Sequence, residues 1–245
     1  MSAARLVRPR LAERLAKARV IANVRGIRDR RFSLLASNCT GTLPYRFLDM
    51  PYTSPTVNLF FFAADYVEFV TRLDHYLAAP LEFARRSRHR EGRATHRAHG
   101  DYPIGVLDDI EIHFMHYASR ADARAKWTRR AARIDRERLV YSMTDRDGAT
   151  PELMERFDAL PGRRLLLSAR PMPWLASAVA VPRWRGESEI GDAYTRYDAL
   201  SHVDFRALVD GPPAGRAPAA RGARVANVAS RPARRPPCSG VPVGT

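Results

Sequence analysis

The stretch "RLVYSMTDRDGATPELMERFDALPGRRLLLSA", residues 138–169, indicates a strand, a short loop, a helix and a second strand. Apolar residues follow one another in "LVY" and in "LLL", a pattern typical of buried strands. Between these runs, Thr150 precedes Pro151, which is the favoured order of a helix N-cap and a first-turn proline. This alternation of strand and helix favours an α/β sheet that helices cover on both faces.

The same alternation extends through the rest of the chain and predicts one three-layer α/β domain with a mostly parallel sheet over residues 31–208. Ser119 is the expected cap of one helix and Asp65 of another. Residues 84–100, "ARRSRHREGRATHRAHG", lack apolar periodicity and are expected to form a loop. The other predicted elements are strands at 31–37, 56–63, 102–107 and 109–117 and helices at 66–77 and 119–134.

The two ends of the chain differ in composition from this domain. Residues 1–30 predict a basic amphipathic helix in which Leu11, Leu15, Ala18, Ile21, Ala22 and Val24 recur at helical spacing. Two interpretations of that helix stay open: it packs on the domain by its apolar stripe, or it rests on anionic lipid. Residues 209–245 are rich in Arg, Pro and Ala and are expected to be disordered.

The net charge of +15 lies almost entirely in these ends. Residues 1–31 hold ten basic and two acidic side chains, and residues 211–245 hold six arginines and no acid, which leaves a net charge of +1 between them. Specific nucleic-acid binding is therefore not expected, because the domain itself lacks a basic footprint. Two distant cysteines, no secretory signal pattern and no apolar run of about 18 residues indicate a cytoplasmic protein.

Ligands of open α/β sheets bind beyond the carboxyl ends of the strands, where "SNCTG", "AADY" and "TDRDG" lie in this sequence. In "TDRDG", Asp145 and Asp147 offer oxygen ligands for Mg²⁺ or Mn²⁺, and Arg146 offers a partner for a phosphate. The alternative is a plain Asp-Gly turn in which Asp145 binds backbone amides. One D-x-D triplet is expected by chance in about 245 residues, so the motif alone decides nothing.

Other polar residues add candidates. Cys39, after the first strand, is a possible thiol nucleophile with a histidine as its base, or a small buried side chain. In "PYTSPT", Tyr52 and Ser54 offer a stacking ring and a hydroxyl for a sugar, or only a proline-bounded turn. Glu111 and His113 alternate along the strand at 109–117 and are the candidate general bases.

Several of these stretches together resemble the bacterial family known as domain of unknown function 1919, whose members are commonly labelled exopolysaccharide or capsule biosynthesis proteins. The similarity covers about residues 31–170. Ser37 and Thr40 depart from the Asn and Trp that members often have beside the cysteine. The family pattern falls on Asn38, Cys39, Gly41, Pro51, Tyr52, Ser54, Pro55, Asp109 to Phe114, Lys126 to Arg130, and Asp145 to Gly148.

The resemblance implies an α/β fold and a role in surface-polysaccharide assembly. We therefore expect a transferase that acts on a sugar or sugar nucleotide. In it, Asp145 and Asp147 bind metal or hydroxyls, and Asp145 is also a catalytic residue beside Glu111 or His113, one of which is the base. Arg146 binds phosphate, and the substrate site is lined by Asn38, Cys39, Tyr52 and Ser54. The alternative is a non-catalytic carbohydrate-binding or assembly protein that the N-terminal helix holds at the inner membrane face.

Overall fold

Four parallel strands form the central sheet. In the computed structural model, which describes residues 4–212 and side chains from Arg10 onward, they lie in the order β1-β5-β6-β7. Each neighbouring pair is parallel, with Leu34 beside Val140 and Ser142 beside Leu165. The strands are β1 Ser33–Ala36, β5 Leu139–Thr144, β6 Arg163–Ser168 and β7 Ala178–Ala180. The predicted α/β class with a mostly parallel sheet is confirmed.

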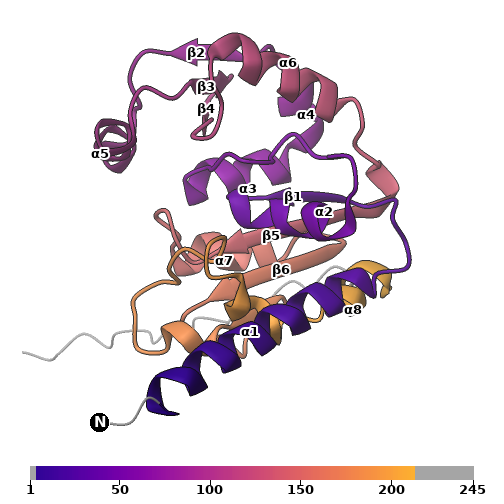
Figure 1. Ribbon diagram of the computed structural model, residues 1–245. Coiled ribbons are helices and arrows are strands. Elements are labelled where there is room, and N and C mark those ends of the chain that lie inside the picture. The colour runs from indigo at the N-terminus through magenta and orange to yellow at the C-terminus, as the bar shows by residue number, and fades with distance from the viewer. Residues whose placement is uncertain (1–3, 213–245) are drawn as a thin grey trace, which may run out of the picture.

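A smaller antiparallel sheet lies above the central one in Figure 1 and was not predicted. Its strands β3 and β4 form a hairpin in which Leu107 pairs with Ile110, so that Asp108 and Asp109 make the turn. Asp108 has a φ of 54°, which suits a two-residue hairpin loop. The strands are β2 Glu82–Ala84, β3 Ile104–Leu107 and β4 Ile110–His113.

Helices cover both faces of the central sheet, and alternate residues of its strands supply two apolar clusters. Leu35 and Met143 face α3, α6 and α7, whereas Leu34 and Val140 face α1, α2 and α8. Because side chains alternate along a strand, this division shows that both faces are buried. The helices are α1 Ala4–Arg25, α2 Thr42–Leu48, α3 Ala63–Thr71, α4 Leu73–Ala78, α5 Arg90–His99, α6 Arg120–Ala131, α7 Pro151–Asp158 and α8 Phe205–Asp210.

The predicted N-terminal helix exists, but only the C-terminal end of its predicted apolar stripe, at Val24, is fully buried. Val20 and Val24 are 1% and 0% exposed and pack with residues of the segment around α8, whereas Leu11 and Leu15 are 55% and 53% exposed. The difference arises because the first half of α1 extends past the edge of the sheet (Figure 1). Its second half packs on the domain, and from the first half Glu13 reaches Arg196 in an ion pair of 3.6 Å.

Two predicted elements at the strand ends are wrong. Residues 56–63 do not form a strand: only Phe60 makes a β-bridge, with His113, and Asn58 interrupts the extended backbone with a φ of 61°. Asp65 is not a cap, since the N-cap of α3 is Phe62. The carboxylate of Asp65 is 2% exposed and turns inward instead.

The expected loop at 84–100 contains the helix α5. Its one buried residue is Gly92, and a Cβ there would lie 2.4 Å from Ser87 Oγ and 2.9 Å from His113 Cε1. The helix thus packs through a glycine, which an apolar pattern does not reveal.

The predicted tail begins too early. Val209 is buried in α8, and Asp210 accepts the backbone N–H groups of Arg28 and Asp29 across 3.0 and 3.1 Å. The expectation of disorder for the rest of the tail falls on residues 213–245, which lie outside the described residues.

Candidate functional site

The loop "TDRDG", residues 144–148, forms a tight turn after β5. The N–H of Ala149 donates to the C=O of Arg146 across 3.2 Å, and Asp147 and Gly148 between them have φ angles of 59° and 81°. Positive φ at both central positions defines a type I′ turn, for which Asp-Gly is a favoured sequence. The backbone here is therefore a turn, as the alternative interpretation predicted.

Asp145 fastens two later segments to the end of β5. Its Oδ2 accepts the N–H of Ala169 across 2.7 Å, and its Oδ1 accepts the N–H of Ile190 across 2.8 Å. Burial raises the pKa of Asp145 above its ordinary value, and these two amides oppose the rise. A substrate or a metal ion would have to displace both amides, so the predicted catalytic and metal-binding roles of Asp145 do not fit the structure.

Asp147 is thus the one carboxylate of the predicted metal pair that is not committed to backbone amides. Across residues 4–212, no three His, Cys, Asp or Glu side chains gather closely enough to hold a metal ion. Mg²⁺ usually combines one or two carboxylates with water and phosphate oxygens. The Asp145–Asp147 pair does not supply the pair of carboxylates that a D-x-D clamp requires.

Asn38 joins the end of β1 to the end of β5. Its Nδ2 donates to Thr144 Oγ1 across 3.0 Å, while its Oδ1 accepts the N–H of Thr40 across 3.1 Å. The second bond caps the short 3₁₀ turn Cys39–Gly41. Asn38 therefore positions the residue that follows it, Cys39, beside the turn after β5.

Cys39 is a free thiol that burial keeps protonated. Burial raises its pKa to about 11, the charges of Asp192 and Asp147 add to the rise, and Arg146 opposes it. Since the thiolate is the nucleophile, a thiol with this pKa is inert at neutral pH. The structure does not support Cys39 as a nucleophile.

Arg146 carries a buried hydrogen-bond donor that has no partner among residues 4–212. Its Nε is shielded from solvent and makes no hydrogen bond within the described residues. Its charge lowers the pKa of Asp147 and of Asp192, so it lies near both carboxylates. An unsatisfied buried donor costs about 1–3 kcal/mol, a cost that an anionic ligand would remove.

Asp147 is partly buried and has a pKa suited to proton exchange. Burial raises this pKa to about 6, the charge of Arg146 opposes the rise, and Glu189 adds to it. Its backbone is also in the left-handed region, which a non-glycine residue adopts at a cost. An acid with a raised pKa next to an unpartnered arginine is typical of a functional site.

The segment 60–63 connects these groups to the small sheet. Phe61 N–H donates to Ser37 C=O, and Ala63 N–H donates to Asp147 C=O, each across 2.9 Å. We refer to Asn38, Cys39, Thr144, Arg146 and Asp147 as the strand-end site. The structure thus brings together five residues from the carboxyl ends of two neighbouring strands.

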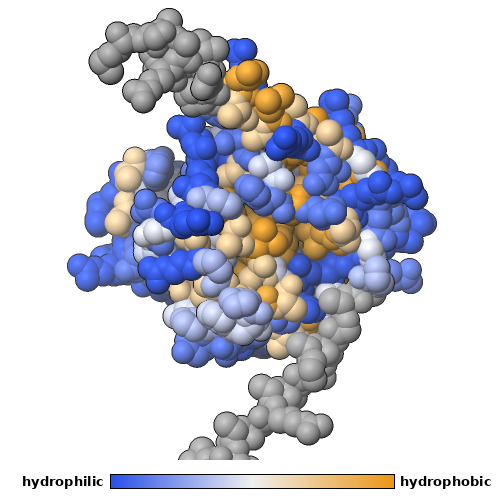
Figure 2. All heavy atoms as spheres, turned by 90° about the horizontal axis from the view of Figure 1, so that it is seen from below, coloured by the Kyte–Doolittle hydropathy of each residue, from blue (hydrophilic) through white to orange (hydrophobic). Residues whose placement is uncertain are grey.

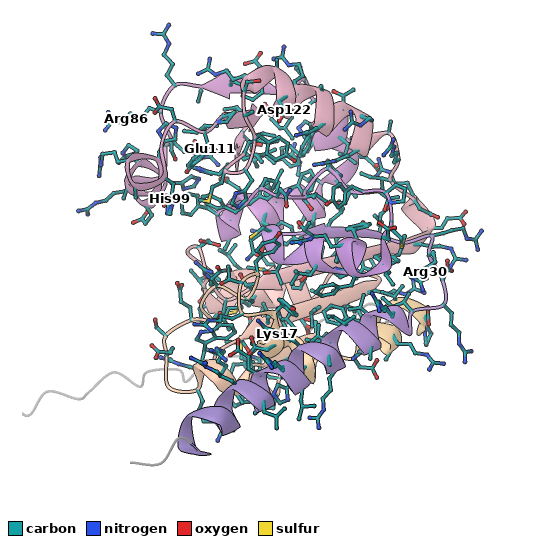
Figure 3. All side chains as sticks on the ribbon, in the orientation of Figure 1. Lys17, Arg30, Arg86, His99, Glu111 and Asp122 are labelled. Atoms are coloured by element: carbon teal, nitrogen blue, oxygen red, sulfur yellow. The ribbon has the colours of Figure 1, made fainter. Side chains whose placement is uncertain are left out.

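Glu111 and His113 lie outside the strand-end site. They are 3% and 0% exposed, and Figure 3 shows Glu111 inward of Arg86 and His99. Glu111 Oε1 lies 2.9 Å from His113 Nε2, although the angles between the two groups do not meet those of a hydrogen bond. The other ring nitrogen, Nδ1, lies 3.0 Å from Tyr102 Oη.

Burial raises the pKa of Glu111, but contacts from His113, Ser87 and the Arg88 N–H together outweigh burial and lower it to about 2. A buried carboxylate with such a pKa is a poor base. The predicted general-base role of Glu111 or His113 therefore does not fit, because both side chains are enclosed and paired.

Tyr52 and Ser54 also lie elsewhere. Ser54 is 0% exposed and its Oγ lies 3.1 Å from Thr56 Oγ1, which in turn accepts the N–H of Ala36 in β1. Tyr52 stacks under Arg130, 4.8 Å from the guanidinium carbon to the ring centre. This turn seals the open edge of β1, so the predicted substrate contacts of Ser54 do not fit.

One polar pair near the strand-end site had no signal in the sequence. Asp65 Oδ2 lies 2.6 Å from His89 Nε2, and the ring of Phe62 stacks on His89 with centroids 4.1 Å apart. The two partners belong to α3 and to the residue before α5, and no spacing rule links them. Only the tertiary structure brings them together.

Two cavities, of about 550 and 740 Å³, lie around α4, β2 and α6. Their walls include His75, Asp108 and Trp127, and none of the predicted site residues. Neither cavity is lined by a buried polar atom without a hydrogen bond or by a side chain with a shifted pKa. Both features occur at the strand ends, which are therefore the candidate site.

Two similarities to known proteins identify the family of the chain. The family model described as "Domain of unknown function (DUF1919)" matches residues 12–210. A relative from Haemophilus influenzae, which bears the name "Uncharacterized protein", is 32% identical over 171 residues, or 69% of this chain and 77% of the relative. Because the family model spans nearly the whole described structure, the chain belongs to the DUF1919 family.

Proposed function

We propose that the protein is a transferase of surface-polysaccharide biosynthesis that binds a sugar nucleotide or another phosphorylated sugar at the strand-end site. The observation that carries this proposal is Arg146, whose buried Nε has no partner among the described residues and which stands at the carboxyl edge of a parallel sheet. Such edges are where open α/β sheets bind ligands. A phosphate oxygen is a suitable acceptor for a guanidinium N–H.

The roles of the other residues follow from their contacts. Arg146 binds the phosphate, Asp147 hydrogen-bonds a sugar hydroxyl, and Asn38 holds the Cys39 turn in place through Thr144. Cys39 supplies a small protonated side chain to the wall of the site. Asp145 stays outside the chemistry and maintains the shape of the loop.

A binding experiment tests the phosphate assignment. Thermal shift with UDP-glucose and GDP-mannose, with and without Mn²⁺, is compared for wild type, Arg146→Gln, Arg146→Lys and Arg129→Gln. Arg129 is exposed on α6 and serves as the matched control. Loss of a charged hydrogen bond is expected to weaken binding about tenfold or more in Arg146→Gln. Undiminished binding by Arg146→Gln would contradict the assignment.

Activity is tested in cells. A deletion strain that carries Asp147→Asn or Arg146→Gln is expected to make less surface polysaccharide than one that carries the wild-type gene. A wild-type amount of polysaccharide with both variants would mean that the strand-end site takes no part in the reaction.

The second candidate function is a non-catalytic assembly protein at the inner face of the membrane. The observation that favours it is the exposure of Leu11 and Leu15, one helical turn apart on α1, among exposed arginines at positions 10, 14 and 19. Figure 2, seen from the side of α1, shows apolar surface in a broken strip across an otherwise hydrophilic face. Leucines flanked by arginines suit the surface of an anionic bilayer.

No helix of residues 4–212 combines the length and the apolar character that crossing a bilayer requires. The proposed contact with a membrane is assigned to the surface of α1, where Leu11 and Leu15 are exposed. Flotation with phosphatidylserine vesicles tests it with Leu11→Ser/Leu15→Ser, and Trp174→Ser, which removes a 65% exposed side chain, is the control. Point variants are needed because Val20 and Val24 of the same helix are core residues. Vesicle binding that the double variant retains would exclude this surface.

A further inference from the structure

His89 has the environment of a catalytic imidazole. Its Nε2 lies 2.6 Å from Oδ2 of Asp65, a carboxylate that is 2% exposed, and Oδ1 of the same carboxylate accepts a hydrogen bond from Arg88. A buried carboxylate at this distance favours the tautomer with the proton on Nε2 over the one in which Nε2 accepts from Arg88 Nε, which lies farther away at 3.4 Å. The other ring nitrogen, Nδ1, is then left with a free electron pair.

The two partners differ in their access to solvent. The side chain of His89 is 21% exposed, whereas that of Asp65 is 3% exposed. The ring therefore reaches the surface while the group that orients it stays inside. This is the arrangement of an imidazole that exchanges protons with a bound molecule and is held in one tautomer from behind.

The pair lies beside the strand-end site. Phe62 packs one face of its ring against His89, and the next residue, Ala63, donates its N–H to Asp147 C=O. Two consecutive residues, Phe62 and Ala63, thus link the imidazole to the turn that carries Arg146. Figure 1 shows the same relationship at the level of the helices, since α5 lies on the same side of the molecule as the loop that leads into α7.

We propose that His89 is the general base of the transfer reaction and that Asp65 is its positioning residue; this inference rests on the proposed function. His89 Nδ1 takes the proton of the acceptor hydroxyl while the hydroxyl oxygen forms a bond to the anomeric carbon of the donor sugar. The bond from that carbon to the phosphate oxygen breaks, and its electron pair leaves with the phosphate, which Arg146 holds. Acceptor sugar and phosphorylated donor are the only reactants.

Two charged side chains contact the ring of His89. Asp65 of α3 and Arg88 of its own loop contact the ring directly. Behind Phe62 lies His113, paired with Glu111, and its ring meets Phe62 edge-on with centroids 5.3 Å apart. The pair Glu111–His113 supports the wall on which His89 rests.

The first test uses unmodified protein. Long-range ¹H–¹⁵N spectra of the histidine rings at pH 7.5 are expected to show His89 with the proton on Nε2 and none on Nδ1. Asp65→Asn is expected to abolish that preference. A proton on Nδ1 in the wild-type protein would overturn the proposal, whatever the variants do.

The second test uses a deletion strain that carries single variants. His89→Gln and Asp65→Asn are expected to lower the amount of surface polysaccharide, with a loss of about 100-fold or more in the transfer rate for His89→Gln. His75→Gln is the matched control, because His75 is an exposed histidine of α4 that pairs with Asp108. Melting temperature and UDP-glucose binding of the purified variants are measured beside it, and both are expected to stay near wild type.

The outcomes separate the two proposals. A wild-type amount of polysaccharide with His89→Gln contradicts the general-base role of His89 but is compatible with the transferase function. A wild-type amount of polysaccharide in the deletion strain itself contradicts both the transferase function and the general-base role of His89. If His89→Gln does not fold, His89→Ala with added imidazole replaces it, and restored transfer supports the proposal, whereas a folded His89→Ala protein that imidazole leaves inactive contradicts it.

Discussion

The backbone N–H of Ala63 donates to the C=O of Asp147 across 2.9 Å. This bond ties the first residue of α3 to the centre of the turn after β5, and so it fixes the distance between the two parts of the candidate site. On one side of it stand Arg146 and the Asp147 carboxylate; on the other stand Phe62 and, stacked on it, His89.

Replacing Asp147 by Asn is expected to stabilise the protein at neutral pH. Because the pKa of Asp147 is raised from 3.8 to about 6, the folded state prefers the protonated carboxyl. That stabilisation is fully present below pH 3.8 and is lost as the pH rises through about 6. Asparagine tolerates the same left-handed backbone. Urea unfolding at pH 7.5 should show a gain on the order of 1–2 kcal/mol that disappears near pH 4.

Asp192→Asn is the matched control, because the pKa of Asp192 is lowered where that of Asp147 is raised. Burial raises the pKa of Asp192, but hydrogen bonds from Thr195 and Tyr194 outweigh it and lower the pKa. This variant is expected to lose stability at pH 7.5. Equal behaviour of the two variants would contradict the buried state of Asp147.

Binding of a sugar nucleotide is expected to weaken as the pH rises through about 6. Ionised Asp147 repels the diphosphate and competes with it for Arg146, while Glu189 adds negative charge nearby. One extra charge at a few ångströms in a water-like medium changes affinity by about fivefold. UDP-glucose is a suitable probe because its diphosphate keeps its charge over this range. Calorimetry at pH 5 and pH 8 should show the difference in wild type and a flat profile in Asp147→Asn.

Replacing Asp145 by Asn is expected to destabilise the fold through its hydrogen bonds, although burial raises the pKa of Asp145 and so disfavours its charge. Asparagine retains one acceptor oxygen, but its NH₂ group then faces the N–H of either Ala169 or Ile190. The loss of a charged hydrogen bond and the clash of two donors are expected to cost about 2–4 kcal/mol. Urea unfolding at pH 7 measures it. A loss below about 0.5 kcal/mol would mean that these two amides do not hold the loop.

Cys39 is expected to react slowly with iodoacetamide. Its pKa of about 11 leaves almost no thiolate at pH 7.5, whereas an ordinary cysteine has a pKa of about 8.5. Peptide-level mass spectrometry after timed alkylation, with a free cysteine peptide as the reference, should show at least a tenfold slower rate. Cys39→Ala is expected to support wild-type polysaccharide. A fast reaction, or an inactive Cys39→Ala variant with a normal melting temperature, would show that Cys39 acts as a nucleophile after all.

The central sheet was largely predictable because its signals are local. The apolar runs at 138–143 and 163–169 became β5 and β6, and Thr150 caps α7 through its Oγ1 as the Thr-Pro pair predicted. Ser119 caps α6 in the same way. Each of these features depends on neighbours within about four residues, so the sequence contains all the information.

The functional residues were predictable only in part. "TDRDG" pointed to the right edge of the sheet, but the two aspartates differ in a way that no pattern shows: Asp145 meets amides of Ala169 and Ile190, and Asp147 does not. Glu111 and His113 alternate as a half-exposed strand would, yet both faces of β4 are buried. Burial of a polar side chain depends on what covers it, which the local sequence does not encode.

The sequence by itself determined the α/β order of elements, the helix caps at Ser119 and Thr150, and the basic first helix, because periodicity and capping act over a few residues. The tertiary structure alone decided that α5 packs through Gly92, that Leu11 and Leu15 remain exposed, and that Asp65 meets His89. These relationships arise from the packing of segments distant in the chain. The candidate site is one of them, since its acid and its arginine come from the turn after β5, whereas its imidazole comes from the loop before α5.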